Sequence, residues 1–226
     1  MRVGVLGTGG VGQTLAAKIS SLGHDVTMGT RDVQAALART DAGWGAKVLS
    51  EWQAEHPDVK LGTFAEAAAH GEIVFNATAG MASLAVLQAA GAENLDGKIL
   101  VDVSNPLDFS SGMPPTLSVC NTDSLAEQIQ RSFPGTKVVK SLNTMTSNLM
   151  VDPGQLAGGD HHAFVSGDDE EAKAEVTRIL QEWFGWRNVL DLGDITSARG
   201  AEMIVPLWLR LMGGLQTPLA TFKVVS

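Results

Sequence analysis

The sequence predicts an α/β fold: a doubly wound parallel sheet with a small helical C-terminal extension. Short apolar stretches alternate with stretches of helical periodicity along most of the chain, which is typical of parallel strands joined by crossover helices. A glycine-rich motif, GTGGVG at 7–12, follows the first apolar stretch, as in the Rossmann type of this fold. No long polar linker interrupts the pattern, so we expect a Rossmann domain at 1–194 and a helical segment at 195–226.

Strands are expected where short apolar runs are bounded by turn residues. They are residues 2–6, 24–29, 59–62, 72–78, 98–104, 136–142, 161–167 and 187–193.

Helices are expected where apolar residues recur at helical spacing. They are residues 12–23, one or two helices within 33–56, then 63–71, 82–91, 122–133, 169–184 and 195–213. The first of these ends at Gly23, and the helix at 63–71 begins with a capping box formed by Thr63 and Glu66. Pro206 is expected to kink the last one.

Composition and charge argue against several classes of protein. The 226 residues carry a formal net charge of -9 at pH 7, which disfavours nucleic acid and anionic membranes as partners. No apolar run approaches the roughly 20 residues of a membrane span, and the first ten residues lack the pattern of a signal peptide. The single cysteine, Cys120, allows no internal disulfide and fits a reducing compartment. We therefore expect a cytoplasmic protein.

The glycine motif predicts dinucleotide binding, because it follows a strand and opens a helix. Gly7 permits the tight turn, Gly9 lets a pyrophosphate approach the backbone, and Gly12 lets the helix pack against the strand. The helix start supplies free N–H groups and partial positive charge. The alternative is a glycine-rich turn that serves packing alone.

The end of the second strand predicts NADP rather than NAD. NAD enzymes usually keep a carboxylate beside the adenosine ribose, but this chain has Thr30 and Arg31 there. Arginine forms forked, charge-assisted hydrogen bonds to phosphate, so the pair suits the 2′-phosphate of NADP(H). Asp25 lies at the wrong end of the strand, and Asp32 is a weaker rival one residue further on.

Polar and small residues also end three later strands, in the loops 76–80, 104–106 and 141–145. The carboxyl ends of parallel strands share one edge of a sheet, where ligands bind. We therefore expect these loops to surround a nicotinamide and its ribose. The side chains expected to bond an amide or ribose hydroxyls are Asn76, Thr78, Ser104, Asn105 and Asn143, with Ala77, Ala79, Pro106 and Met145 beside them.

No catalytic residue and no metal site is assigned. The chain contains no tyrosine, which excludes a Tyr-x-x-x-Lys acid pair. His161 and His162 would point to opposite faces of a strand. A catalytic lysine at Lys140 is a minor alternative.

Several segments together resemble the NADP-dependent oxidoreductases linked to coenzyme F-420, a deazaflavin. They are MRVGVLGTGGVGQTLA, TRD, VDVSNP, VVKSLNT and ARGAEMIVPLWLRLMGG. The glycine loop and VVKSLNT are also similar to the cytoplasmic domains of STEAP-type metalloreductases.

The resemblance implies a homodimer that transfers a hydride directly between nicotinamide and a deazaflavin or flavin. It also implies that Thr8 and the loop amides of Gly10 and Val11 hold phosphate, and that residues near Asn105, Pro106, Asn143 and Met212 wall the hydride site. Such transfer needs little acid–base help from the protein. Two alternatives stay open: an NADPH-dependent reductase of a small carbonyl or imine, and a non-catalytic NADPH-sensing module.

Overall fold

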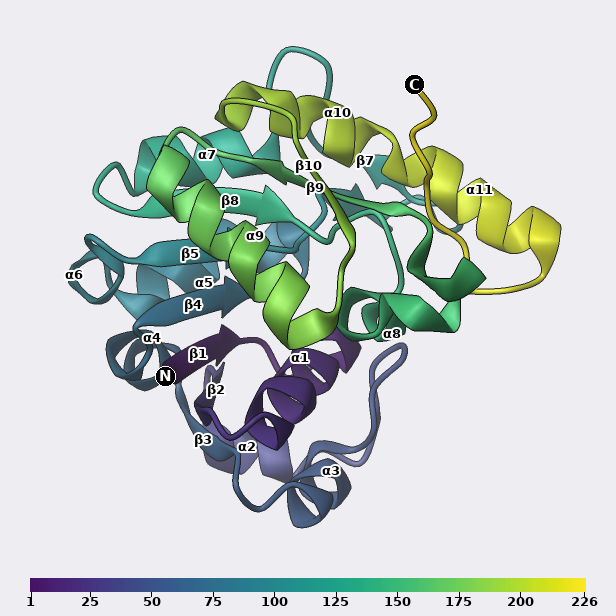
Figure 1. Cartoon of the computed structure of the whole chain (residues 1–226). Helices are drawn as coiled ribbons and strands as arrows, with labels where there is room; N and C mark the ends of the chain where they lie inside the picture. Colours follow the sequence, from purple (N-terminus) through teal and green to yellow (C-terminus); the bar gives the residue numbers. More distant parts are fainter.

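A computed structural model describes residues 1–226, which form one eight-stranded sheet with helices on both sides (Figure 1). The strand order is β10-β9-β8-β5-β4-β1-β2-β3. The strands are β1 (Arg2–Leu6), β2 (Asp25–Thr30), β3 (Lys60–Thr63), β4 (Ile73–Asn76), β5 (Ile99–Asp102), β8 (Lys137–Ser141), β9 (His162–Ser166) and β10 (Asn188–Asp191). The strands β6 (Leu107–Asp108) and β7 (Thr116–Leu117) form a separate small hairpin that the sequence did not predict.

The helices connect the strands and cover both faces of the sheet. They are α1 (Gly10–Ser21), α2 (Val33–Leu37), α3 (Leu49–Glu55), α4 (Phe64–His70), α5 (Gly80–Ala90), α6 (Ala92–Leu95), α7 (Leu125–Ser132), α8 (Ser147–Val151), α9 (Glu170–Phe184), α10 (Ala198–Met203) and α11 (Val205–Leu215). Short 3₁₀ helices lie at Pro153–Gln155, Ala157–Gly159 and Ile195–Ser197. The capping box of α4 is confirmed, because Thr63 and Glu66 each bond the other's backbone N–H.

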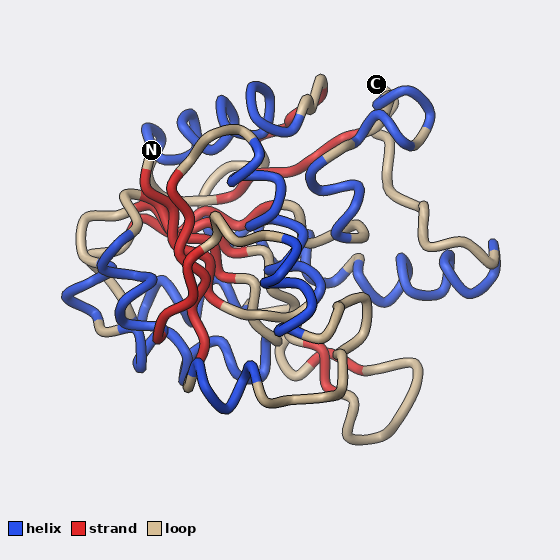
Figure 2. The backbone as a smooth tube through the Cα atoms, turned by 90° about the horizontal axis from the view of Figure 1, so that it is seen from below, coloured by secondary structure: helices blue, strands red, loops and turns tan.

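Helices lie on both sides of the strands (Figure 2), and two apolar clusters fill the space between the sheet and these two helical layers. One contains buried residues of α1, α3, α8 and α9, and the other contains residues of α4, α5, α6 and α7. This arrangement confirms the expected doubly wound Rossmann fold, in which each face of a mostly parallel sheet is buried by helices.

The order of the strands places a topological switch point between β1 and β4. The chain runs outward from β1 through β2 to β3, and in the other direction from β4 through β5 to β8. All these strands are parallel, so their carboxyl ends share one edge of the sheet. Ligands bind at this position in open α/β sheets.

The sheet differs from the expected all-parallel one because β9 runs antiparallel to β8, and β10 is parallel to β9. A parallel strand needs a long crossover, usually a helix across the sheet face. The only α-helix between β8 and β9 is α8, which has five residues and is too short to carry the chain back to the opposite edge.

The C-terminal helical segment divides into α10 and α11, and Pro206 lies in the first turn of α11, where proline is tolerated. Trp208 is buried against Val205 and Ala220, and its ring N–H donates to the carbonyl of Ala220 over 2.7 Å. No helix has both the length and the apolar character that crossing a membrane requires.

Candidate functional site

The turn between β1 and α1 is built on two glycines that tolerate no side chain. Gly7 has φ of +113°, and its N–H donates to the carbonyl of Gly29 on β2 over 3.0 Å. A Cβ at Gly12 would lie 2.0 Å from the carbonyl oxygen of Gly7. The first turn of α1 therefore packs directly on the turn before it, as the sequence predicts.

Gly9 differs from both of these glycines because nothing in the protein requires it. Its φ of -79° and ψ of -176° are open to any residue, and a Cβ built on it meets no atom within 4 Å. Gly9 nevertheless lines the cleft above the sheet edge. Free space at this point fits the close approach of a pyrophosphate to the backbone.

We predict that Gly9→Ala keeps the thermal stability of the protein but weakens NADPH binding by at least about tenfold, since the methyl group would occupy the pyrophosphate position. Thermal unfolding and a fluorescence titration with NADPH check the two halves of the prediction. Unchanged NADPH affinity in this variant would contradict the assignment of Gly9.

A cleft of about 430 Å³ lies over the switch point, between the ends of β1, β2 and β4. Eight of the predicted cofactor-binding residues line it. They are Gly7, Thr8, Gly9, Thr30, Arg31, Ala77, Thr78 and Ala79. The glycine loop, the end of β2 and the loop after β4 therefore share one cavity, although they come from separate parts of the sequence.

The β2 end of the cleft carries two arginines, Arg31 and Arg39. Both side chains are exposed. Neither forms an ion pair, whereas most of the other lysines and arginines of the chain do. Asp32 also lines the cleft, but one of its oxygens accepts the N–H of Ala35 over 2.9 Å and caps α2. With two arginines against one carboxylate, this end of the cleft suits a polyvalent anion.

Sequence reasoning missed Arg39. Its Nη2 donates to Thr8 Oγ1 over 3.3 Å, so it reaches the glycine loop from the connection between α2 and α3. Gln13 holds that connection down, because its side chain donates to the carbonyl of Lys47 and accepts the N–H of Lys47, both over 2.9 Å. This pairing joins residues 34 apart in the chain and helps to hold the connection that carries Arg39 beside the glycine loop.

The other predicted cofactor-binding residues do not line this cleft. They are Gly10, Val11, Gly12, Asn76, Ser104, Asn105, Pro106, Asn143 and Met145. Asn76, Ser104 and Asn143 are at most 4% exposed. Asn76 donates to Asp102 Oδ1 over 2.8 Å, and Asn143 donates to Asn105 Oδ1 over 2.9 Å. These side chains lie at the expected edge of the sheet and bond one another; a direct role in cofactor binding stays a prediction.

Lys140 is fully buried between two carboxylates, those of Asp102 and Glu202. Burial by itself lowers the pKa of a lysine, but the negative charges of the two carboxylates and their hydrogen bonds raise the pKa of Lys140 above its ordinary value. A lysine whose pKa is raised and which has no access to the cleft does not suit catalysis by proton abstraction or by Schiff-base formation.

Comparison with known proteins agrees with this geometry. The family model described as NADP oxidoreductase coenzyme F420-dependent matches residues 2–106. The F420-dependent NADP reductase of Methanothermobacter marburgensis is 29% identical over 216 residues, covering 93% of this chain and 92% of that protein. A crystal structure of a proposed F420-dependent NADP reductase from Arthrobacter sp. FB24 is 59% identical, with a TM-score of 0.96 and full coverage of both chains. The metalloreductase STEAP3 of Rattus norvegicus is 30% identical over 92% of this chain and 38% of its own length.

Together with these relatives, the fold and the cleft define an NADP-dependent oxidoreductase. More particularly, the chain belongs to the family of coenzyme F420-dependent NADP oxidoreductases. The resemblance to this family, and the more distant one to STEAP-type reductases, are both confirmed.

Proposed function

We propose that this protein transfers a hydride between NADP(H) and a ring-type acceptor, either a deazaflavin of the coenzyme F420 kind or a flavin. The observation that carries the proposal is the distribution of charge in the cleft. Its charged lining residues are Arg31, Asp32 and Arg39, all at the β2 end. The part near Thr78 and Ala79 presents no ionisable side chain, as expected for hydride transfer between two rings, which needs no protein acid or base.

Each part of the cleft has a distinct role in this proposal. The amides of the glycine loop and the start of α1 hold the pyrophosphate. Thr30, Arg31 and Arg39 hold the 2′-phosphate through charge-assisted hydrogen bonds. The nicotinamide points along the sheet edge, toward Thr78 and the loop 104–106. NADPH supplies the hydride, and the protein sets the distance and facing of the two rings and excludes water.

The names of the relatives support a deazaflavin as the first acceptor to test. The Methanothermobacter marburgensis relative is an F420-dependent NADP reductase, and the Arthrobacter structure is proposed to be one. Both match this chain over more than nine-tenths of their length.

The test is an acceptor assay on the purified protein. NADPH is mixed with a deazaflavin, FMN, FAD or riboflavin, and the loss of nicotinamide absorbance is followed. Turnover with a ring acceptor is the expected result. Turnover only with a cyclic imine or a small carbonyl would select the small-substrate alternative, and tight NADPH binding without any turnover would select the sensor.

A further inference from the structure

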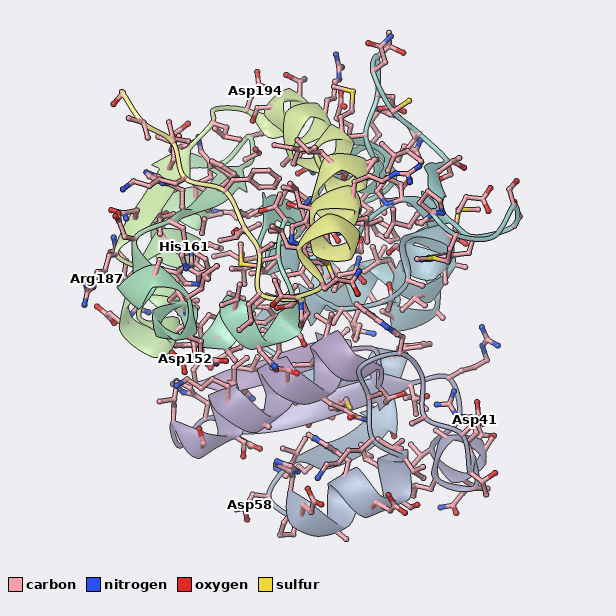
Figure 3. The ribbon with its side chains drawn as sticks, turned by 90° about the vertical axis from the view of Figure 1, so that its right-hand side faces the viewer. Asp41, Asp58, Asp152, His161, Arg187 and Asp194 are labelled. Carbon is pink, nitrogen blue, oxygen red and sulfur yellow. The ribbon has the colours of Figure 1, made fainter.

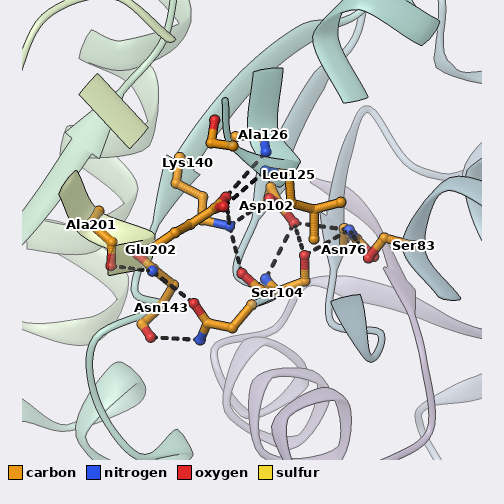
Figure 4. Close-up of polar contacts among 12 residues, drawn as sticks. Asn76, Ser83, Asp102, Ser104, Leu125, Ala126, Lys140, Asn143, Ala201 and Glu202 are labelled. Carbon is orange, nitrogen blue, oxygen red and sulfur yellow. Dashed lines mark hydrogen bonds and ion pairs between the residues drawn. The ribbon is translucent and has the colours of Figure 1, made fainter. Parts of the chain in front are cut away.

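Lys140 is the centre of a buried polar cluster at the carboxyl ends of β5 and β8 (Figure 4). Its ammonium group donates to Asp102 Oδ2 over 2.8 Å, to Glu202 Oε1 over 2.9 Å and to the carbonyl of Ser104 over 2.5 Å. The side chains of the lysine and of both acids are at most 1% exposed. All three N–H donors of the lysine are therefore occupied.

The cluster fixes Ser104 from both sides. Asp102 Oδ1 accepts the N–H of Ser104 over 3.2 Å and its hydroxyl over 2.7 Å, while Lys140 holds the carbonyl. Ser104 opens the loop 104–106 that ends β5. This loop consequently leaves the sheet from a fixed point and in a fixed direction.

The same cluster ties α10 to β8 and α7. Glu202 on α10 is the second carboxylate of Lys140, and it also accepts the N–H groups of Leu125 and Ala126 at the start of α7, over 2.8 and 3.1 Å. One residue earlier, the carbonyl of Ala201 accepts a hydrogen bond from Asn143 over 2.9 Å. The helix α10 and the loops after β5 and β8 are thus held in one arrangement.

Stability alone does not explain a lysine in this position. Removing charges from water is unfavourable, and replacing a buried ion cluster by apolar side chains is often neutral or stabilising. An apolar residue at 140, however, would leave the carbonyl of Ser104 without a donor. What the lysine adds is a defined position for that carbonyl and for α10.

We propose that Lys140 is a positioning residue for hydride transfer: through the carbonyl of Ser104 and through Glu202 it sets the place of the loop 104–106 and of α10 at the nicotinamide end of the crevice. This inference rests on the proposed function for the location of the nicotinamide. Lys140 does not touch the cofactor; it acts through the loop.

The test compares two variants. Lys140→Met alone would leave two buried carboxylates uncompensated, so it is combined with Asp102→Asn, which removes one negative charge and keeps an oxygen for Ser104. The matched control is Lys173→Met. Lys173 is 3% exposed, and it also contacts two acids, Glu170 over 2.8 Å and Asp191 over 3.0 Å, and one carbonyl. Asp191 is the last residue of the edge strand β10, so Lys173 contacts a strand that β9 and β8 separate from β5.

The first readout is binding, which needs no acceptor. In the wild type, NADP⁺ should bind more tightly than 2′,5′-ADP, which lacks the nicotinamide half. The Lys140→Met/Asp102→Asn variant should keep the affinity for 2′,5′-ADP within about twofold. Its affinity for NADP⁺ should fall until it exceeds the affinity for 2′,5′-ADP only slightly. The second readout is turnover, because kcat should fall by at least about tenfold when the rings are misplaced. Lys173→Met should change the midpoint of thermal unfolding but neither readout.

The outcomes are separable. A double variant that keeps the wild-type ratio of the two affinities and the wild-type kcat would overturn the proposal and leave Lys140 a purely structural role. If the wild type transfers no hydride to any ring acceptor, the proposed function fails, but the ratio of affinities still decides the role of Lys140. Lys140→Met/Glu202→Gln, which removes the other carboxylate charge, takes the place of the double variant if that one does not unfold cooperatively.

Discussion

Replacing both Arg31 and Arg39 with alanine should weaken NADPH binding by about two orders of magnitude or more and change NADH binding by less than about threefold. A hydrogen bond to a charged group contributes about 1.5–3 kcal/mol, and about 1.4 kcal/mol corresponds to a factor of ten in affinity. Arg31→Ala alone should cost at least about tenfold. The selectivity arises because NADH lacks the 2′-phosphate that both arginines are proposed to bind.

Titrations of both variants with NADPH and NADH at fixed ionic strength measure the effect. The control is Arg187→Ala, which removes the same charge from an exposed arginine without an ion pair. Asp41 belongs to the same connection between α2 and α3 as Arg39. Arg187 lies on the opposite side of the molecule from Asp41 (Figure 3). If the double variant lost NADPH and NADH affinity equally, the arginines would not be responsible for the preference for NADP.

Arg31→Lys gives a second comparison at constant charge. Lysine is a point charge without the planar fork that matches two phosphate oxygens. Binding between that of the wild type and Arg31→Ala is expected if the fork contributes as well as the charge. Higher salt should weaken NADPH binding in the wild type more than in the double variant, because surface charges are screened.

The glycine turn and the end of β2 could be predicted from the sequence because their geometry is local. A strand, a tight turn and a helix start follow one another within the first 21 residues, and Arg31 directly follows β2. Each of these features is determined by neighbours in the chain. The same holds for the capping box of α4, where Thr63 and Glu66 are three residues apart.

Contacts between distant segments could not be predicted in this way. Arg39 contacts Thr8 across 31 residues, and the connection that carries it is held by the pairing of Gln13 and Lys47 across 34 residues. Asn143 and Asn105 were expected at the correct edge of the sheet, but they bond each other across 38 residues. Both residues lie in loops that follow β5 and β8, where no periodic pattern shows which way a side chain points, so their place at the ligand-binding edge alone suggested that they face a ligand.

The antiparallel direction of β9 could not be predicted for a similar reason. Its apolar run has the same appearance whichever way the strand points, and the direction depends on the short connection before it. Lys140 shows the limit most clearly: a lysine inside an apolar strand gives no sign of its partners, which lie 38 and 62 residues away in the chain.

Gly12→Ala should disturb the fold strongly, unlike Gly9→Ala in the same glycine loop. The added Cβ would lie 2.0 Å from the carbonyl oxygen of Gly7 and 2.9 Å from its carbonyl carbon. Both are backbone atoms of a turn that is itself held to Gly29 by a hydrogen bond, so neither can move without shifting the start of α1. Overpacking of this kind typically costs about 1–3 kcal/mol and occasionally more.

The expected result is a fall of several degrees in the midpoint of thermal unfolding, since about 1 kcal/mol shifts it by roughly 2–4 °C in a domain of this size. NADPH binding should also be lost, because the N–H groups of the displaced helix start no longer face the pyrophosphate. Gly9→Ala is the matched variant: the same methyl group, three residues earlier, meets no protein atom and should leave the midpoint unchanged. Equal midpoints for the two variants would show that α1 does not pack on the turn as described, because only a contact within the protein distinguishes Gly12 from Gly9 in the absence of cofactor.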